Sequence, residues 1–314
     1  MTSAGWASLP PQYAIPESAP SLSEAEEYCR RLARSHYENF SVASWFLPGH
    51  LRQHFFNVYA YCRISDDLGD EVGDKAASLR LLDEWEAELN ACYEGEPRHP
   101  VFVALRQTVR KYEIPKREFA DLLTAFRQDQ TASRYQTFAD LLGYCRYSAN
   151  PVGHLVLYLC GYRDAERQQL SDYTCTALQL ANFWQDVSLD FAKGRIYLPL
   201  EDLRRFGVRE EEIRNSENTS EFRKMMRFEV ARTREWFEQG SPLAGMVDRR
   251  LATDIDLFSR GGREILKAIE RQEYAVLGQR PVISKARKLA LVARAALGQV
   301  ARRPHGPLAT GEPL

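Results

Sequence analysis

Proline is spaced so widely along this chain that long helices are the structure it most readily permits. Between Pro20 and Pro281, proline occurs only at positions 48, 97, 100, 115, 151, 199 and 242. Because proline lacks a backbone donor and clashes with the preceding turn, it ends helices and leaves the intervals between its positions open to them. Apolar residues in these intervals recur at helical spacing rather than at every second position. The pattern predicts an all-α protein.

The expected helices can be placed from this pattern and from capping residues. In the segment SLSEAEEYCRRLA, Ser23 and Glu26 have the spacing of a capping box, which predicts the start of the first helix. The other helices are expected at about 50–72, 76–93, 100–112, 116–129, 137–160, 164–192, 219–239, 248–277 and 283–300. Pro151 and Gly153 should kink or break the helix at 137–160.

The sequence shows no internal boundary. Between residues 21 and 300 there is no change of composition and no Gly/Ser-rich linker, which predicts one domain over 21–300. Residues 1–20 lack the basic and apolar regions of a signal peptide, so we expect a flexible leader there and a flexible tail at 301–314. No uninterrupted apolar run reaches about 18 residues, which argues against a conventional membrane-spanning helix.

Charge is balanced overall and uneven locally. Lys and Arg total 42 and Asp and Glu total 43, so no net field favours a nucleic-acid partner. In residues 280–303, cations alternate with Leu and Val and no acidic residue occurs. This stretch predicts peripheral contact with an anionic membrane, such as the inner face of the plasma membrane, although a packed last helix with a solvated basic face explains it equally well. The six cysteines follow no zinc or disulfide spacing, so we expect reduced thiols in a cytoplasmic protein.

Two pairs of carboxylates interrupt helical segments that are otherwise apolar. Asp66 and Asp70 lie in YAYCRISDDLGDE, and Asp186 and Asp190 lie in NFWQDVSLDFAKGRIYLP. Each pair is spaced i, i+4 and therefore shares one helical face. A lone acidic turn is usually a solvated surface, but two such pairs among aromatic and aliphatic neighbours indicate four carboxylates facing one cavity. Because a buried unpaired charge is costly, we expect a cation to meet them.

Magnesium and a diphosphate group suit these residue types. Hard oxygen ligands without accompanying His or Cys favour Mg²⁺, which typically uses a few carboxylates together with waters and phosphate oxygens. Arg63, Lys193, Arg195 and Tyr197 supply the cations and the hydroxyl that could hold the other side of a diphosphate. No Gly-rich phosphate loop is present, which argues against a P-loop or Rossmann nucleotide site.

Five segments of the chain, taken together and in order, resemble the squalene and phytoene synthase family of all-α isoprenoid synthases. The matching segments are SHYENFSVAS, YAYCRISDDLGDE, YCRYSANPVG, LQLANFWQDVSLDFAKGRIYLP and ILKAIERQEYAVLGQRPVISKARK. The resemblance implies a single-domain helical bundle around a central cavity, where Mg²⁺ and a prenyl diphosphate are held between the acidic motifs. It implies catalytic roles for Asp66, Asp70, Asp186, Asp190, Arg63 and Tyr59, with Asn182 joining the four aspartates as metal ligands. The implied substrate contacts are Phe40, Arg63, Tyr144, Gln179, Asn182, Arg195 and Tyr197.

Finer details resemble one branch of that family, the hydroxysqualene synthases of the bacterial hopanoid pathway. HYENF stands where many relatives carry a Ser-Lys-Ser/Thr-Phe stretch, Asn150 replaces part of a Gly-containing step, Gln185 stands where Arg is common, and Gly262 stands where Tyr is common. This branch implies a lyase-type reaction of presqualene diphosphate with water, without a nicotinamide cofactor, and companion enzymes of the hopanoid pathway as partners. Asn150 and Gln185 are added to the substrate-binding candidates because an alcohol product requires a positioned water.

Two other functions fit the sequence. The same fold could act as a farnesyl transferase that joins two farnesyl diphosphates into presqualene diphosphate or squalene, and product analysis separates that reaction from the first. A non-catalytic assembly factor of this fold, as in some mitochondrial relatives, would tend to lose acidic residues, whereas both pairs are intact here.

Overall fold

The computed structural model describes residues 10–35, 48–284, 286–287 and 290. Within these ranges no strand occurs, and the one isolated β-bridge joins Arg134 to Ile196. The all-α prediction is therefore confirmed. The helices are α1 (Leu22–Ser35), α3 (Gly49–Asp70), α4 (Lys75–Glu94), α5 (Pro100–Tyr112), α6 (Lys116–Asp129), α7 (Phe138–Ser148), α8 (Asn150–Leu159), α9 (Ala165–Ala192), α10 (Leu200–Phe206), α11 (Glu210–Arg214), α12 (Ser220–Gly240) and α13 (Arg249–Arg271), with short 3₁₀ helices η2 (Pro11–Tyr13) and η3 (Ser241–Gly245).

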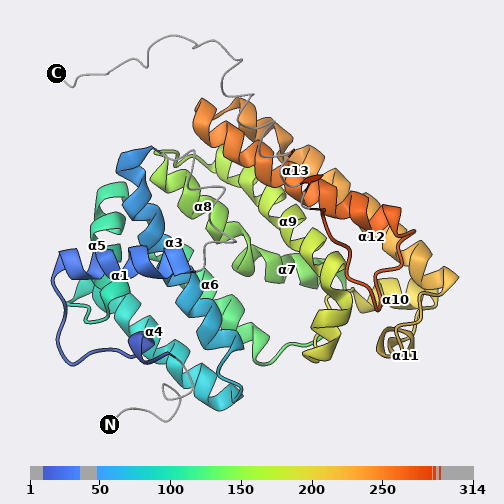
Figure 1. Ribbon diagram of the computed structural model, residues 1–314, viewed down its shortest axis with the longest axis horizontal. Helices are drawn as coiled ribbons and strands as arrows, with labels where there is room; N and C mark the ends of the chain where they lie inside the picture. The colour runs from blue at the N-terminus through green and yellow to red at the C-terminus, as the bar shows by residue number, and fades with distance from the viewer. Residues whose placement is uncertain (1–9, 36–47, 285, 288–289, 291–314) are drawn as a thin grey trace.

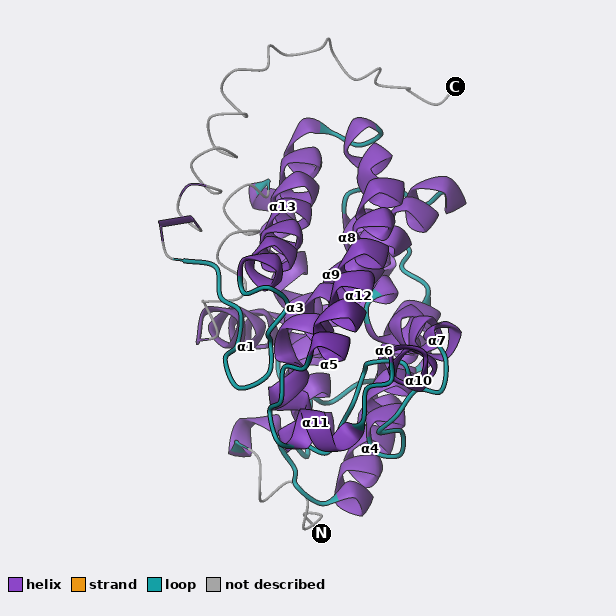
Figure 2. Ribbon diagram, turned by 90° about the vertical axis from the view of Figure 1, so that its right-hand side faces the viewer, coloured by secondary structure: helices purple, strands orange, loops and turns teal. Residues whose placement is uncertain are grey.

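The helices form two groups that meet through α7 and α8. In the first group, α3 packs against α1, α4, α5 and α6, and in the second, the long helix α9 lies against α12 and α13 (Figure 1). Helix α8 contacts α3 and α6 on one side and α9 on the other. Figure 2 shows α9 beside α12, with α13 running along the same group. This arrangement places the ends of α3 and α9, which carry the acidic pairs, in neighbouring layers.

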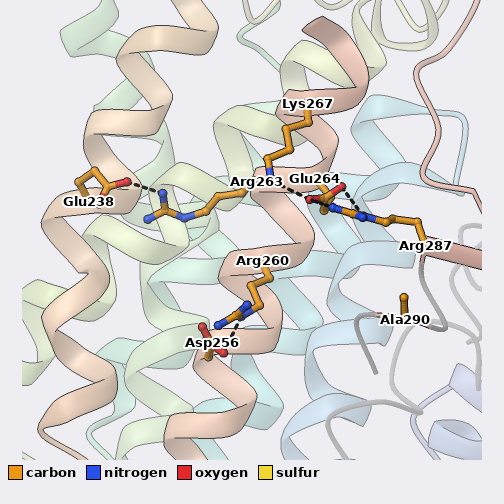
Figure 3. A pocket seen from close by; sticks show the side chains of 8 residues that line it. All are labelled: Glu238, Asp256, Arg260, Arg263, Glu264, Lys267, Arg287 and Ala290. Atoms are coloured by element: carbon orange, nitrogen blue, oxygen red, sulfur yellow. Dashed lines mark hydrogen bonds and ion pairs between the residues drawn. The ribbon is translucent and has the colours of Figure 1, made fainter. Parts of the chain in front are cut away.

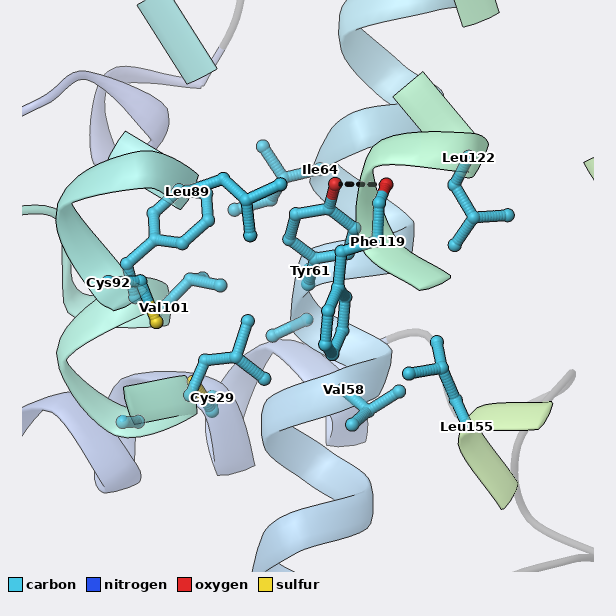
Figure 4. Packing of buried hydrophobic residues seen from close by; sticks show 14 of the residues in the cluster. Cys29, Val58, Tyr61, Ile64, Leu89, Cys92, Val101, Phe119, Leu122 and Leu155 are labelled. Atoms are coloured by element: carbon cyan, nitrogen blue, oxygen red, sulfur yellow. Dashed lines mark hydrogen bonds between the residues drawn. The ribbon is translucent and has the colours of Figure 1, made fainter. Parts of the chain in front are cut away.

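Each group is built around large buried side chains that hold these two helices in place. On α3, Tyr61 is fully buried beside Phe119, and its hydroxyl donates to the Phe119 carbonyl at 2.8 Å (Figure 4). On α9, Trp184 is fully buried and donates to the Thr233 hydroxyl at 2.7 Å. Burial of each such ring stabilises the fold by about 1.5–3 kcal/mol. The buried rings therefore fix the positions of α3 and α9, the two helices that carry the acidic pairs.

The helix boundaries confirm most of the sequence-based placements and correct some. Helix α7 ends at Ser148 and α8 begins at Asn150, so the predicted break near Pro151 is confirmed. The predicted capping box is wrong by two residues: Ser21 and Glu24 form it, because the helix already begins at Leu22.

Other differences lie near the C-terminal part of the chain. The helix expected over 248–277 ends at Arg271, because Glu273 and Tyr274 adopt positive φ angles that a helix cannot contain. The short helices α10 and α11 were not predicted. The helix expected over 283–300 lies almost entirely outside the described residues.

Two composition-based expectations can also be compared with the structure. All six cysteines are free, and Cys29, Cys92 and Cys145 are buried, as expected for reduced thiols. Among the described residues, no helix is both long and apolar enough to cross a membrane.

Candidate active site

The end of α3 and the turn after α9 are joined by ion pairs on one aspartate. One oxygen of Asp70 accepts from Nη2 of Arg195 at 2.9 Å, and the other lies 3.3 Å from Nζ of Lys193. Both cations follow α9 in a turn that Gly194 makes possible, since its φ of 79° is one that side-chain-bearing residues avoid. The sequence-predicted cations thus meet an acidic residue of the first pair from the opposite helix.

The second acidic pair has a partner that the sequence analysis did not include in the site. Asp186 lies at a non-helical point of α9, with φ −108° and ψ 15°, and is held by a two-point ion pair from Arg280. In this pair Nη2 of Arg280 donates to Oδ2 of Asp186 at 3.0 Å. In the sequence, only its place in the last family-like segment distinguishes Arg280 from the other cations of the basic stretch.

Gln185 fixes the segment that carries Arg280. Its side-chain nitrogen donates to the carbonyl of Pro281 at 2.6 Å, and its oxygen accepts from Nη2 of Arg280 at 3.3 Å. Gln185 is buried, so these bonds satisfy an amide that could not be left unpaired cheaply. The structure therefore places Gln185 beneath the Asp186–Arg280 pair.

The carboxylates of the two pairs differ in their electrostatic balance. Burial and the neighbouring charge of Asp70 raise the pKa of Asp66 to about 6, and burial together with Asp186 raises the pKa of Asp190 to about 7. For Asp70, burial alone would raise the pKa, but the hydrogen bond from Arg195 and the charges of Arg195 and Lys193 outweigh it and lower the pKa. Asp190 forms no side-chain hydrogen bond with the described residues. For Asp66 and Asp190, therefore, the nearby cations do not offset the burial and like charge that disfavour the ionised form.

Arg63 is held on α3 beside the first pair. Its Nε donates to Oδ2 of Asp67 at 3.1 Å and its Nη2 bonds the other oxygen of Asp67, while Nη1 lies 3.7 Å from Asp66. Asp67 is buried, so it holds Arg63 in place and does not share the more exposed face on which Asp66 and Asp70 lie. Tyr59 lies one turn before Arg63, and burial raises the pKa of its hydroxyl.

An aromatic group adjoins the carboxylates. Tyr197 stacks on Phe183 with ring centres 3.9 Å apart, and Tyr144 lies 5.7 Å from Tyr197. The Tyr144 hydroxyl donates to Asp129 at 3.0 Å. Asp129 was not predicted, because a single acid at the end of a helix has no pattern to distinguish it. Burial raises its pKa to about 6 despite the nearby charge of Arg195, so it adds a fifth carboxyl group to this region.

The remaining predicted residues are distributed around α8 and α9. Asn150 is buried at the start of α8, and its side-chain oxygen accepts from the Thr176 hydroxyl at 3.0 Å. Gln179 is half-buried and Asn182 is exposed on α9. Phe40 lies outside the described residues.

The ligand set can be compared with what a metal ion requires. Within the described ranges, no three His, Cys, Asp or Glu side chains come close enough to form a complete metal site. Mg²⁺ commonly binds through one or two carboxylates, with waters and phosphate oxygens completing its octahedron. Asp66 and Asp190 fit such a site, because a cation would stabilise the ionised carboxylates that burial and the neighbouring aspartates disfavour, as their raised pKa values indicate.

A hollow of about 430 Å³ lies elsewhere, on the surface of α12 and α13 (Figure 3). Its charged side chains are paired with one another: Arg260 bonds Asp256, and Glu264 bonds both Lys267 and Arg287. None of the acidic-pair residues lines it. Arg280 and Arg287, two cations of the stretch predicted to contact a membrane, form ion pairs within the protein, with Asp186 and Glu264 respectively.

This chain is similar to known proteins in sequence and in fold. Residues 33–287 match the family model described as squalene/phytoene synthase. The phytoene synthase of Arthrospira platensis is 31% identical over 284 residues, covering 85% of this chain and 91% of the relative. The crystal structure of squalene synthase HpnC from Alicyclobacillus acidocaldarius has a TM-score of 0.77 at 46% identity, covering 86% of this chain and 98% of that one. A dehydrosqualene synthase in complex with a ligand has a TM-score of 0.80 at 26% identity, covering 90% and 98%.

The fold and the paired carboxylates define an isoprenoid-synthase type of helical bundle. The chain belongs to the squalene/phytoene synthase family. It is accordingly a prenyltransferase-type enzyme of isoprenoid biosynthesis.

Proposed function

We propose that this enzyme uses Mg²⁺ to convert presqualene diphosphate and water into hydroxysqualene and diphosphate. The observation that carries the proposal is that each carboxylate pair is bonded to cations near the ends of α3 and α9. Asp70 pairs with Lys193 and Arg195, and Asp186 pairs with Arg280. Acidic and basic groups in one place suit a magnesium diphosphate, which presents both a cation and an anion. The 46% identity with a solved squalene synthase supports a substrate of this chemical class.

The chemistry begins at the bond between carbon and the diphosphate oxygen. This bond breaks with both electrons leaving on the diphosphate, so negative charge grows where Arg63, Lys193 and Arg195 can stabilise it. When bound between the acidic pairs, Mg²⁺ would neutralise part of the same charge. The stacked rings of Phe183 and Tyr197 provide an apolar, electron-rich wall for the carbocation. Water then forms the new carbon–oxygen bond, and its proton leaves with the diphosphate.

The structure around Gly262 supports the branch to which the sequence was assigned. A Cβ atom at Gly262 would lie 2.5 Å from Cζ of Phe237 and 2.8 Å from Cδ2 of Leu178. A larger side chain, such as the tyrosine that the family resemblance implies for many relatives at this position, would have to displace the Phe237 ring. The α9–α12–α13 packing of this chain is therefore adapted to glycine, and the phenol of those relatives has no counterpart at this position.

The proposed function is tested with purified protein, Mg²⁺, and either presqualene diphosphate or farnesyl diphosphate, each with and without NADPH. Mass spectrometry of the products should show hydroxysqualene from presqualene diphosphate whether or not NADPH is added. A second candidate, condensation of two prenyl diphosphates, is favoured by the relatives named phytoene synthase and squalene synthase. Presqualene diphosphate or squalene formed from farnesyl diphosphate, without the alcohol, would establish that reaction instead.

Placement of the quenching water leads to a prediction on product ratio. The side-chain nitrogen of Asn150 has no hydrogen bond to the described residues, so it can hold a water while Thr176 fixes the amide. We expect Asn150→Ala to keep releasing diphosphate but to shift the product from alcohol toward eliminated or rearranged hydrocarbon. Gln185→Leu is the contrasting variant, since loss of the bond to Pro281 should slow diphosphate release instead.

The measurement is the ratio of alcohol to hydrocarbon, with the product oxygen traced by labelled water. An unchanged ratio in Asn150→Ala removes that residue from the water site. Loss of ionisation in Asn150→Ala would assign it to the diphosphate end.

The raised pKa values predict a pH profile that depends on magnesium. As pH falls, Asp190 is protonated near pH 7 and Asp66 near pH 6, and a protonated carboxyl binds Mg²⁺ poorly. The rate of diphosphate release should therefore fall through this window, and a higher Mg²⁺ concentration should move the fall to lower pH. Rates measured from about pH 5.5 to 8.5 at two Mg²⁺ concentrations check this. A profile that does not move with Mg²⁺ would contradict the assignment of these carboxylates.

A further inference from the structure

A residue of the expected leader is anchored in the body of the protein. Tyr13 is only 2% exposed and belongs to the same buried cluster as α3. Pro10 and Pro11 precede it, and the η2 turn is closed by the bond from the Tyr13 amide to the Pro10 carbonyl at 2.8 Å. Because proline fixes its own φ, this turn directs Tyr13 inward at a small cost in backbone entropy. The expectation of a loose segment up to residue 20 therefore does not describe Tyr13.

The Tyr13 hydroxyl reaches a carboxylate that holds Arg63. It donates to Oδ2 of Asp67 at 2.8 Å, and the same oxygen accepts from Nε of Arg63 at 3.1 Å. Nη2 of Arg63 bonds the other oxygen of Asp67. Tyr13 and Arg63 together thus engage both oxygens of a carboxylate that is 5% exposed.

The geometry of Arg63 explains why the orientation of Asp67 matters. Asp66 and Asp67 lie three and four residues after Arg63, so both can reach the guanidinium. Arg63 turns its Nε and Nη2 edge to Asp67, which leaves Nη1 at 3.7 Å from Asp66 on the side of the acidic pair. Rotation of the Asp67 carboxylate would break this two-point contact and redirect Nη1.

We propose that Tyr13 is a positioning residue of the active site, which acts through Asp67 to aim the Arg63 guanidinium at the diphosphate group. The proposal rests on the proposed function only in that a diphosphate binds at the acidic pairs. The hydroxyl of Tyr13 holds Asp67 in the rotamer that pairs with Arg63. Asp66 then faces the metal and diphosphate side, and the N-terminal segment becomes part of the enzyme's binding machinery.

The test compares diphosphate binding by the unaltered chain and by Tyr13→Phe, which keeps the ring and removes only the hydroxyl. The probe is inorganic diphosphate in excess Mg²⁺, with the dissociation constant measured by calorimetry. Because Tyr13 acts through Asp67 and does not touch the diphosphate, only part of the effect of losing a hydrogen bond to a charged group should reach binding, so we expect the dissociation constant to rise about fivefold to tenfold. Thermal unfolding of the same variants shows whether the fold is retained.

Tyr93→Phe is the matched control. The Tyr93 hydroxyl also donates a hydrogen bond, from a less buried position, to the Ile114 carbonyl at 2.9 Å, but its partner does not contact Arg63. This variant should bind diphosphate as the unaltered chain does. On an Arg63→Ala background, Tyr13→Phe should cause no further loss, because its effect passes through Arg63.

Equal binding by Tyr13→Phe and the unaltered chain would overturn the positioning role, as would a full additional loss on the Arg63→Ala background. A failure of the proposed function looks different. If the unaltered chain binds diphosphate but forms no hydroxysqualene, the assigned product is wrong and the role of Tyr13 is still decided by the binding data. If the unaltered chain binds no diphosphate, both proposals are overturned.

Discussion

Replacement of Asp66, Asp70, Asp186 or Asp190 by Ala, one at a time, is expected to abolish diphosphate release while the helical fold remains. Each variant removes an oxygen ligand from the place where the proposed magnesium diphosphate binds, so the loss in rate should be at least the roughly 10²–10³ that removal of one preorganised electrostatic group costs. Asp70 and Asp186 also hold the cations Lys193, Arg195 and Arg280 in place. The measurement is the rate of diphosphate release, with circular dichroism as the check on helix content.

Asp256→Ala provides the control for these variants. Asp256 is an exposed residue of α13 that forms an i, i+4 ion pair with Arg260 at 2.6 Å, away from the acidic pairs. Its removal should leave the rate near normal, since such surface pairs contribute little. Near-normal turnover in a variant of either acidic pair would remove that residue from the site, and loss of helical signal would move the explanation to folding.

His154→Gln is expected to lower the free energy of unfolding by about 3 kcal/mol, because it removes the closer of the two cations that pair with the buried Glu118 carboxylate and leaves only Arg117, at 3.5 Å. His154 lies between Glu118 at 2.8 Å and Asp172 at 2.7 Å and so joins α6, α8 and α9. The Glu118 side chain is 2% exposed. Chemical unfolding followed by circular dichroism measures the difference.

The same histidine gives stability a pH dependence with a defined sign. Burial alone would lower the pKa of His154, but hydrogen bonds to Asp172 and Glu118 outweigh it and raise the pKa to about 9. A raised folded-state pKa means that the stabilisation is fully present below the unfolded value of about 6.5 and is lost as pH rises through 9. The unaltered chain should therefore be less stable at pH 9.5 than at pH 6.5, by roughly the amount that separates it from His154→Gln.

His54 supplies the control for this pH effect. Burial and the charge of Lys111 lower its pKa to about 4, so it is neutral in the folded state throughout that window. His54→Gln should keep the same loss of stability between pH 6.5 and 9.5 as the unaltered chain. A chain whose stability does not fall over this range would contradict a charged His154.

The sequence allowed prediction of features that depend on local spacing. Proline positions gave the long helices, and the break at Pro151 followed from the ring's geometry. The i, i+4 spacing of Asp66 with Asp70 and of Asp186 with Asp190 identified residues that the structure places at the ends of α3 and α9. These features required no knowledge of how the helices pack.

Contacts made by distant parts of the chain could not be predicted in this way. Arg280 reaches Asp186 across 94 positions, and Tyr13 reaches Asp67 across 54, so no local pattern joins either pair. Asp129 enters the site only because α6 ends beside the aromatic group. In each case tertiary packing decides which of many similar charged or aromatic residues becomes functional.

The irregular backbone at Asp186 affects how the second acidic pair can respond to a ligand. An unbroken helix would fix two carboxylates four residues apart at the rise of about one turn. Here the non-helical residue divides α9 between the two, so Asp186 ends the long, well-packed part and Asp190 lies on the short terminal part that leads to Lys193. The two carboxylates thus lie on either side of a joint in α9. The distance between them depends on the angle at this joint. If these two aspartates hold the proposed Mg²⁺, a small change in the angle of the joint would adjust the distance between their carboxylates without bending the long part of α9 that packs in the core.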